Sequence, residues 1–84
     1  MSNLYQRALN HFGEQNQRLK LVEEMAELTR ACVRFDDFEN FVEEIADVQI
    51  MLEQMIQEHE IGELVSCVKS AKLKRLEKLL DDAI

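Results

Sequence analysis

Apolar residues recur along most of the chain at spacings of three and four, which is the pattern of helices with one buried side. The pattern is clearest over residues 14–34 and 38–58. The apolar positions in these two segments are Leu21, Met25, Leu28, Cys32 and Phe35 in the first, and Phe41, Ile45, Val48, Leu52 and Met55 in the second. Both segments are therefore predicted to be amphipathic helices.

Two further helices are predicted over residues 2–12 and 63–82. Gly13 suits the left-handed position just after a helix, and an aspartate in the break at residues 35–38 can cap the helix that follows. In the last segment the apolar positions drift around the helix axis: Leu64, Val65, Val68, Leu73, Leu76 and Leu80. The chain has no proline and only two glycines, too few for the turns of a sheet protein. We therefore predict a single all-α domain over residues 1–84.

The short break between the two long helices predicts an antiparallel helical hairpin at the centre of the fold. Pairing Met25 with Val48 and Leu28 with Ile45 places the turn inside the same break, so the pairing is self-consistent. Apolar residues also lie outside these stripes: Phe12, Val22, Val33, Met51, Ile56 and Leu79. Four short helices bury little surface, so we expect a bundle-like chain that assembles as a homodimer or homotetramer.

Four carboxylates stand out on the two long helices. Glu24 and Glu27 are three residues apart on the first, and Glu44 and Asp47 are three apart on the second. Residues at this spacing share one side of a helix. Each pair is displaced from its apolar stripe in the same rotational sense, so both pairs should line one edge of the hairpin, half-sheltered beside the core.

Two interpretations of this acidic edge remain open from the residues alone. On a solvated helix face, basic residues usually alternate with acidic ones. Along the acidic side of the first long helix the only basic residues are Lys20 and Arg34, at its two ends. Four converging like charges destabilise a fold unless a cation neutralises them, and oxygen ligands favour Mg²⁺ or Mn²⁺. The alternative is a non-enzymatic helical interaction module whose acidic edge is solvated.

The net charge of −7 argues against binding to a nucleic-acid polymer. It does not exclude a nucleotide, because a bound cation can reverse the charge of an acidic pocket. No apolar run is long enough to cross a membrane, and the first residues lack the pattern of a signal peptide. We therefore expect a cytoplasmic protein without a membrane partner.

The segments Glu23-Glu24-Met25-Ala26-Glu27-Leu28 and Glu43-Glu44-Ile45-Ala46-Asp47-Val48 resemble the ExxE…ExxD signature of the MazG-like all-α nucleoside triphosphate pyrophosphohydrolases. The segment Lys72-Leu73-Lys74-Arg75-Leu76 is similar to the basic K-x-x-R segment on the last helix of many small members. The resemblance covers residues 20–76, which is most of the chain.

The resemblance implies a Mg²⁺-dependent enzyme that cleaves an NTP or dNTP between the α and β phosphates. It implies that the metal ligands are Glu24, Glu27, Glu44 and Asp47, with Glu27 or Glu24 as the group that accepts a proton from the attacking water. Lys72 and Arg75 would then contact the outer phosphates. Lys20, one turn before the first glutamate of the signature, is a further candidate phosphate ligand.

Overall fold

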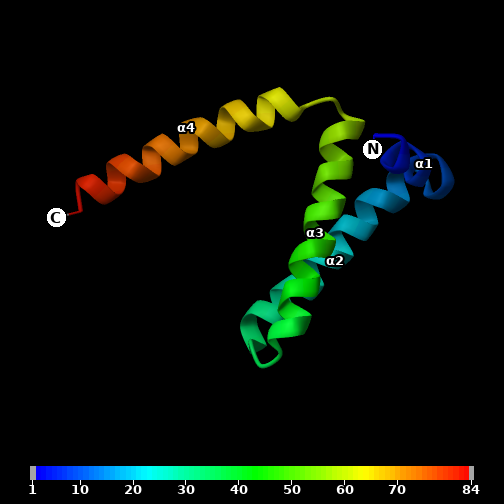
Figure 1. Cartoon of the computed structure of the whole chain (residues 1–84), viewed down its shortest axis with the longest axis horizontal. Helices are drawn as coiled ribbons and strands as arrows, with labels where there is room; N and C mark the ends of the chain where they lie inside the picture. Colours follow the sequence, from blue (N-terminus) through cyan, green and yellow to red (C-terminus); the bar gives the residue numbers. More distant parts are fainter. Residues whose placement is uncertain (1, 84) are drawn as a thin grey trace.

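The computed structural model describes residues 2–83, and within them the chain forms four α-helices and no strand (Figure 1). They are α1 (Ser2–Phe12), α2 (Glu14–Arg34), α3 (Phe38–Glu58) and α4 (Gly62–Asp81). The predicted all-α class and the central antiparallel hairpin are confirmed. The predicted helix limits differ from the observed ones by one residue at each end of α4 and agree elsewhere.

The breaks between helices follow from local backbone chemistry. Gly13 has φ 91° and ψ 150°, so its φ is positive as expected, although its ψ is not that of a left-handed helix. Phe35 takes the left-handed conformation instead, with φ 46° and ψ 39°, and its N–H donates to the carbonyl of Ala31. Asp37 is the N-cap of α3, and its carboxylate accepts a hydrogen bond of 3.1 Å from the N–H of Asn40. The predicted aspartate cap is therefore confirmed.

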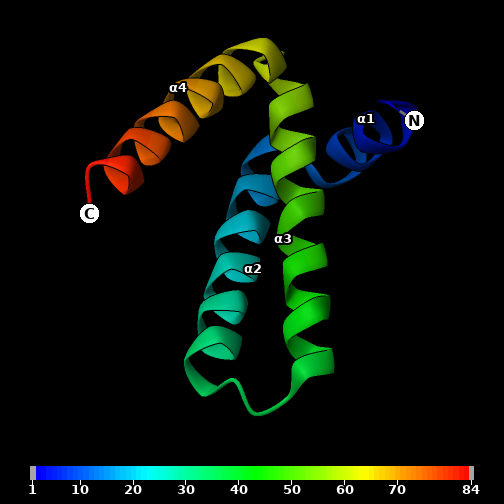
Figure 2. The same ribbon diagram turned by 60° about the vertical axis from the view of Figure 1, so that its left-hand side comes forward.

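Helices α2 and α3 pack side by side along most of their length (Figure 2). The buried apolar residues of the described chain are Leu21, Ala31, Val48 and Met51, and the buried polar residues are Gln17, Glu24 and Gln54. No described side chain is completely removed from solvent. The core of a single chain is therefore a thin seam between two helices, and polar groups make up part of it.

The orientation of both helices about their axes differs from the prediction. Met25 is 41% exposed, Leu52 is 42% exposed, and Cys32 is exposed, although all three were expected in the core stripe. The inward side of α2 instead includes Glu24 and Ala31, each one position before a predicted core residue. Stripes that overlap in this way are both compatible with the sequence, and the small Ala31 side chain allows α3 to approach on this side.

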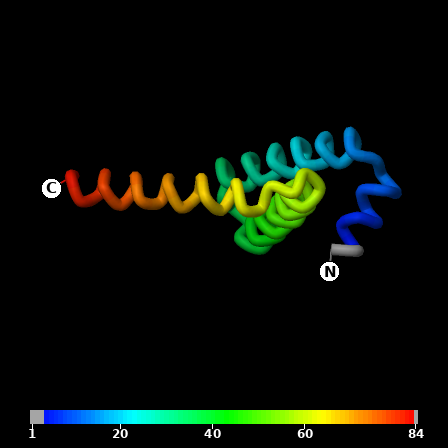
Figure 3. The backbone as a smooth tube through the Cα atoms, turned by 90° about the horizontal axis from the view of Figure 1, so that it is seen from above, coloured from blue at the N-terminus to red at the C-terminus, as the bar shows by residue number. Residues whose placement is uncertain are grey.

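The two outer helices differ in how they are held. Helix α1 contacts both helices of the hairpin, and the Tyr5 hydroxyl donates a 2.7 Å hydrogen bond to Glu53 on α3. Helix α4 contacts α3 alone and has no buried residue. In the three views its C-terminal half lies apart from the hairpin (Figures 1, 2 and 3). None of the described helices is long and apolar enough to cross a membrane.

Replacing the capping residue should weaken the hairpin at its turn. We expect Asp37→Ala to lower the free energy of unfolding by about 1 kcal/mol, because the N–H of Asn40 loses its acceptor. Asp36→Ala is the matched control, since it removes the same charge one residue away. Urea denaturation followed by circular dichroism measures both. Equal losses in the two variants would contradict a specific capping role.

Candidate metal centre

The hairpin brings three of the four predicted carboxylates together. One carboxylate oxygen from each of Glu24, Glu44 and Asp47 lies within 4.8 Å of the others. Two oxygen ligands of one Mg²⁺ ion are at most about 4.2 Å apart, since each lies about 2.1 Å from the metal. The three groups are therefore close to the spacing of a shared ion, and a small inward movement would suffice for binding.

Burial is graded across the cluster. Glu24 is 7% exposed, Glu44 is half-buried and Asp47 is exposed. The sequence pattern predicted carboxylates beside the core, whereas Glu24 lies within the seam itself, because both helices are turned toward their acidic sides. The cluster thus extends from the buried seam at Glu24 to the solvent-exposed surface at Asp47.

Two buried oxygens of the cluster have no hydrogen-bond partner. They are Oε2 of Glu24 and Oε2 of Glu44. The other carboxylate oxygen of Glu24, Oε1, forms an ion pair with Nζ of Lys20 at 3.0 Å. A buried carboxylate oxygen without a partner is costly, and proteins satisfy nearly all such atoms. A divalent cation placed between the two oxygens would satisfy both. The donor set therefore fits the hard oxygen-binding ion that the sequence resemblance implies.

The electrostatics of the cluster agree with its crowding. The pKa of Glu44 is raised, first by burial and then by the neighbouring carboxylates, of which Glu27 has the largest effect, followed by Asp47 and Glu24. Glu27 therefore lies beside Glu44, although it is outside the group of three. The pKa of Lys20 is also raised, chiefly by its hydrogen bond to Glu24. One cation of the protein thus offsets part of the negative charge.

The predicted phosphate-binding residues divide into two groups. Lys20 lies next to the cluster through its ion pair with Glu24. Lys72 and Arg75 lie on α4, and among the described residues neither forms an ion pair with any carboxylate. Within one chain, α4 approaches only the end of α3 and then leads away (Figure 1). The single chain therefore does not bring Lys72 and Arg75 to the cluster.

Two pockets that the sequence pattern did not predict adjoin the cluster. One, of about 280 Å³, is lined by Glu27 and Glu44 together with Arg30, Ala31, Arg34, Asp36, Asp37 and Asn40. The other, of about 500 Å³, is lined by Lys20 with Phe12, Asn16, Gln17 and Met51. The spacing of Gln17, Lys20, Glu24 and Glu27 along α2 was the available signal, because it places them on one side of the helix.

A second group of titratable residues is less suited to a metal. Atoms of Glu14, Glu58 and His59 also lie within 4.8 Å of one another. Glu14 already pairs with Arg18 at 2.6 Å, and Glu14 and His59 are exposed. None of the three has a buried oxygen without a partner. The buried, unpartnered carboxylate oxygens that distinguish the first cluster therefore do not occur among these three residues.

Comparisons of the chain with models of protein families, with curated proteins and with solved structures found no match.

The raised pKa of Glu44 predicts how the metal-free protein responds to pH. The folded chain holds the Glu44 proton more tightly than the unfolded chain, so stability falls as pH rises from the ordinary value of 4.5 through the raised folded value. In EDTA, the melting temperature of Glu44→Gln should therefore fall less than that of wild type as the pH rises above 4.5. Glu43→Gln, which alters an exposed neighbour, should follow the wild-type slope. Parallel curves for wild type and Glu44→Gln would contradict the crowded cluster.

Proposed function

We propose that this chain is a Mg²⁺-dependent nucleotide pyrophosphohydrolase. It cleaves an NTP or dNTP between the α and β phosphates and releases the monophosphate and pyrophosphate. The observation that carries the proposal is the pair of buried, unpartnered oxygens of Glu24 and Glu44, in a group of carboxylates that also includes the exposed Asp47. The reaction type comes from the resemblance of the two acidic segments to the MazG-like signature.

In this proposal, the position of each carboxylate determines whether it binds the metal or accepts a proton. Glu24, Glu44 and Asp47 would hold Mg²⁺, since their oxygens lie nearest to one another. When bound, the metal supplies positive charge to the phosphate oxygens and lowers the pKa of coordinated water. Glu27 lies beside Glu44 but outside the closest group, so it can accept the proton of the attacking water as a general base.

The environment of Glu24 also fits this chemistry. Lys20 holds one carboxylate oxygen of Glu24 at 3.0 Å and leaves the other, which is buried, free to bind a cation. A nucleotide carries several negative charges and would be repelled by four carboxylates alone, so the reaction requires the cation for binding as well as for chemistry. No side chain is required as a nucleophile, because water attacks the phosphorus directly.

The alternative is a non-enzymatic interaction module with a solvated acidic edge. The exposure of Asp47 and the net charge of −7 agree with it. The burial of Glu24 does not, because a solvated edge has no reason to place a carboxylate in the seam of the hairpin at a cost in desolvation. The burial of that one residue makes the metal-dependent enzyme the better account.

Metal binding should stabilise the fold before any substrate is added. An ion that binds only the folded state adds ~2.7 kcal/mol to the free energy of unfolding when its concentration is 100 times Kd. Millimolar Mg²⁺ or Mn²⁺ should therefore raise the melting temperature measured by circular dichroism. Glu44→Gln should reduce this rise, and the control Glu43→Gln should keep it. A melting temperature that neither Mg²⁺ nor Mn²⁺ changes would favour the interaction module.

Activity and stability should respond in opposite directions to one substitution. Asp47→Asn is nearly isosteric, yet an amide is a poorer ligand than a carboxylate for a hard cation. We expect turnover to fall at least about 100-fold, equivalent to ~2.7 kcal/mol of transition-state stabilisation. In EDTA the variant should melt no lower than wild type, because one repelling charge has gone.

The assay is release of pyrophosphate from the eight common nucleotides, with Mg²⁺ and with EDTA. Glu43→Gln is the control for loss of charge on the same helix. An Asp47→Asn protein with the wild-type rate would remove this residue from the metal centre, and a wild-type protein inactive on every nucleotide would count against the proposed function.

A further inference from the structure

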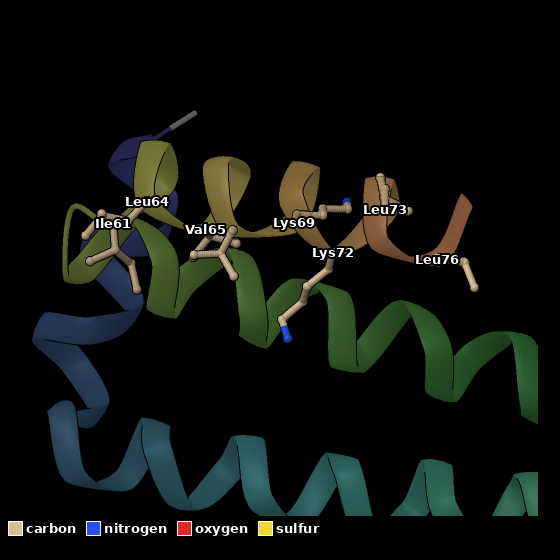
Figure 4. A pocket seen from close by; sticks show the side chains of 8 residues that line it. Ile61, Leu64, Val65, Lys69, Lys72, Leu73 and Leu76 are labelled. Atoms are coloured by element: carbon tan, nitrogen blue, oxygen red, sulfur yellow. The ribbon is translucent and has the colours of Figure 1, made fainter. Parts of the chain in front are cut away.

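Helix α4 is an arm whose apolar side has no partner within the chain. Ile61, Leu64, Val65, Val68, Leu73 and Leu76 line one open groove along it, and Lys69 and Lys72 lie among them (Figure 4). None of the side chains of α4 is buried, and Leu73 and Leu76 are at least half exposed. Contiguous apolar surface of this kind marks a site of association.

The connection, rather than packing of α4, sets the direction of the arm. The N–H of Ile61 donates to the carbonyl of Ile56, and the N–H of Glu60 donates to that of Gln57. The N–H of Val65 then donates to the carbonyl of Ile61, so α4 begins directly from a hydrogen-bonded turn. The arm is thus held away from its own hairpin by backbone bonds.

The single chain exposes far more surface than a folded monomer of its mass. Such monomers expose about 5,200 Å², whereas this chain exposes 7116 Å². The excess of about 1,900 Å² is of the size that a permanent interface removes from one partner. The radius of gyration of 16.0 Å is likewise larger than the roughly 12 Å of a compact chain of this length.

Charge identifies the surface that the arm fits. Helix α4 carries five of the ten basic residues and three acidic ones, so its net charge is +2. The hairpin over residues 14–58 carries twelve acidic and four basic residues, a net charge of −8. A basic arm is therefore attracted to an acidic hairpin rather than to a second arm.

The hairpin also has apolar residues for the arm to cover. Met25, Cys32 and Leu52 were expected in the core, and they are instead exposed on the hairpin. The twenty residues of α4 extend for about 30 Å, close to the length of each 21-residue hairpin helix. One arm can thus lie along the whole of one hairpin.

We infer that two copies of this chain exchange their α4 arms, each laying its apolar and basic side on the hairpin of the other. The exchange is reciprocal, so it closes as a two-fold dimer. It also brings α4 of one copy to the acidic hairpin of the second, where Lys72 and Arg75 can reach the carboxylate cluster. This last consequence rests on the proposed function, whereas the exchange itself does not.

The assembly is tested first by sedimentation equilibrium at low micromolar concentration. Wild type should be a dimer or an assembly of dimers, and a folded species near 9.9 kDa would overturn the inference. Val68→Glu with Leu76→Glu places charge in the apolar groove and should give monomers. Ser66→Glu with Ser70→Glu adds the same charge to the opposite side of α4 and should leave the dimer intact.

The position of the arm is tested without changing the groove. A nitroxide on Cys67 of the Cys32→Ser variant lies on the side of α4 away from the groove. This chain is mixed with a second chain that is ¹⁵N-labelled and carries no nitroxide. The nitroxide should then broaden amide signals of α2 and α3 in the ¹⁵N-labelled copy. Broadening confined to α4 would show pairing of two arms and would overturn the exchange, as would the absence of any broadening between copies.

Complementation of activity tests the shared site. Asp47→Asn chains mixed with chains carrying Lys72→Ala and Arg75→Ala should regain about one quarter of wild-type turnover, because half of the dimers are mixed and one of their two sites is intact. Both parent variants should be far less active alone. A mixture no more active than its parents would show that each site uses its own α4. If wild type itself is inactive, the proposed function fails while the nitroxide measurement still decides the exchange.

Discussion

The carboxylate of Glu24 lies in the seam between the two long helices, and much of the structure depends on this burial. A carboxylate taken out of water destabilises the folded chain unless opposite charge or hydrogen bonds offset the loss. Lys20 satisfies one of its oxygens, at 3.0 Å, and leaves the other without a partner. The interior of the hairpin thus contains a carboxylate oxygen without a hydrogen-bond partner, and the proposed Mg²⁺ would satisfy it.

The same burial determines what the hairpin leaves outside. The helices are turned so that Glu24 and Glu44 face inward, and this rotation moves Met25 and Leu52 out of the seam. A core of apolar residues alone would have covered those side chains and exposed the carboxylates. The acidic cluster and the uncovered apolar surface are thus two results of one rotation, and the two proposals, a bound cation and an exchanged helix, address one each.

The sequence was sufficient for the helices and for their connections. Gly13 and the aspartates before Phe38 mark the breaks, and no proline or β-branched run competes with helix formation elsewhere. The convergence of Glu24, Glu44 and Asp47 also followed from the sequence, because the spacing within each helix and the position of the turn together fix which residues are level with one another.

The rotation of the helices could not be predicted, because two overlapping stripes share Leu21 and Leu28. They differ in whether Met25 and Cys32 or Glu24 and Ala31 face inward. Hydrophobic content favours Met25, whereas in the structure Glu24 and Ala31 are the buried residues. The direction of α4 was equally inaccessible, since it depends on the backbone bonds around Glu60, whose φ of 53° is unusual for a residue other than glycine. The distance of Arg75 from the cluster therefore could not follow from its motif.

The two partners of the hairpin are also linked through charge. A divalent ion in the cluster reduces the net charge of the hairpin from −8 to −6, so metal binding weakens only part of its attraction for a basic arm. Exposed charges are screened over about 8 Å at physiological ionic strength, and their contribution to affinity is small. In the proposed exchange, the apolar side of α4 would then supply most of the energy of association, while Lys69, Lys72 and Arg75 would favour the acidic hairpin over a second arm. With this division, a metal ion could bind to and leave the proposed dimer without dissociating it, as the proposed hydrolysis of a charged substrate would require.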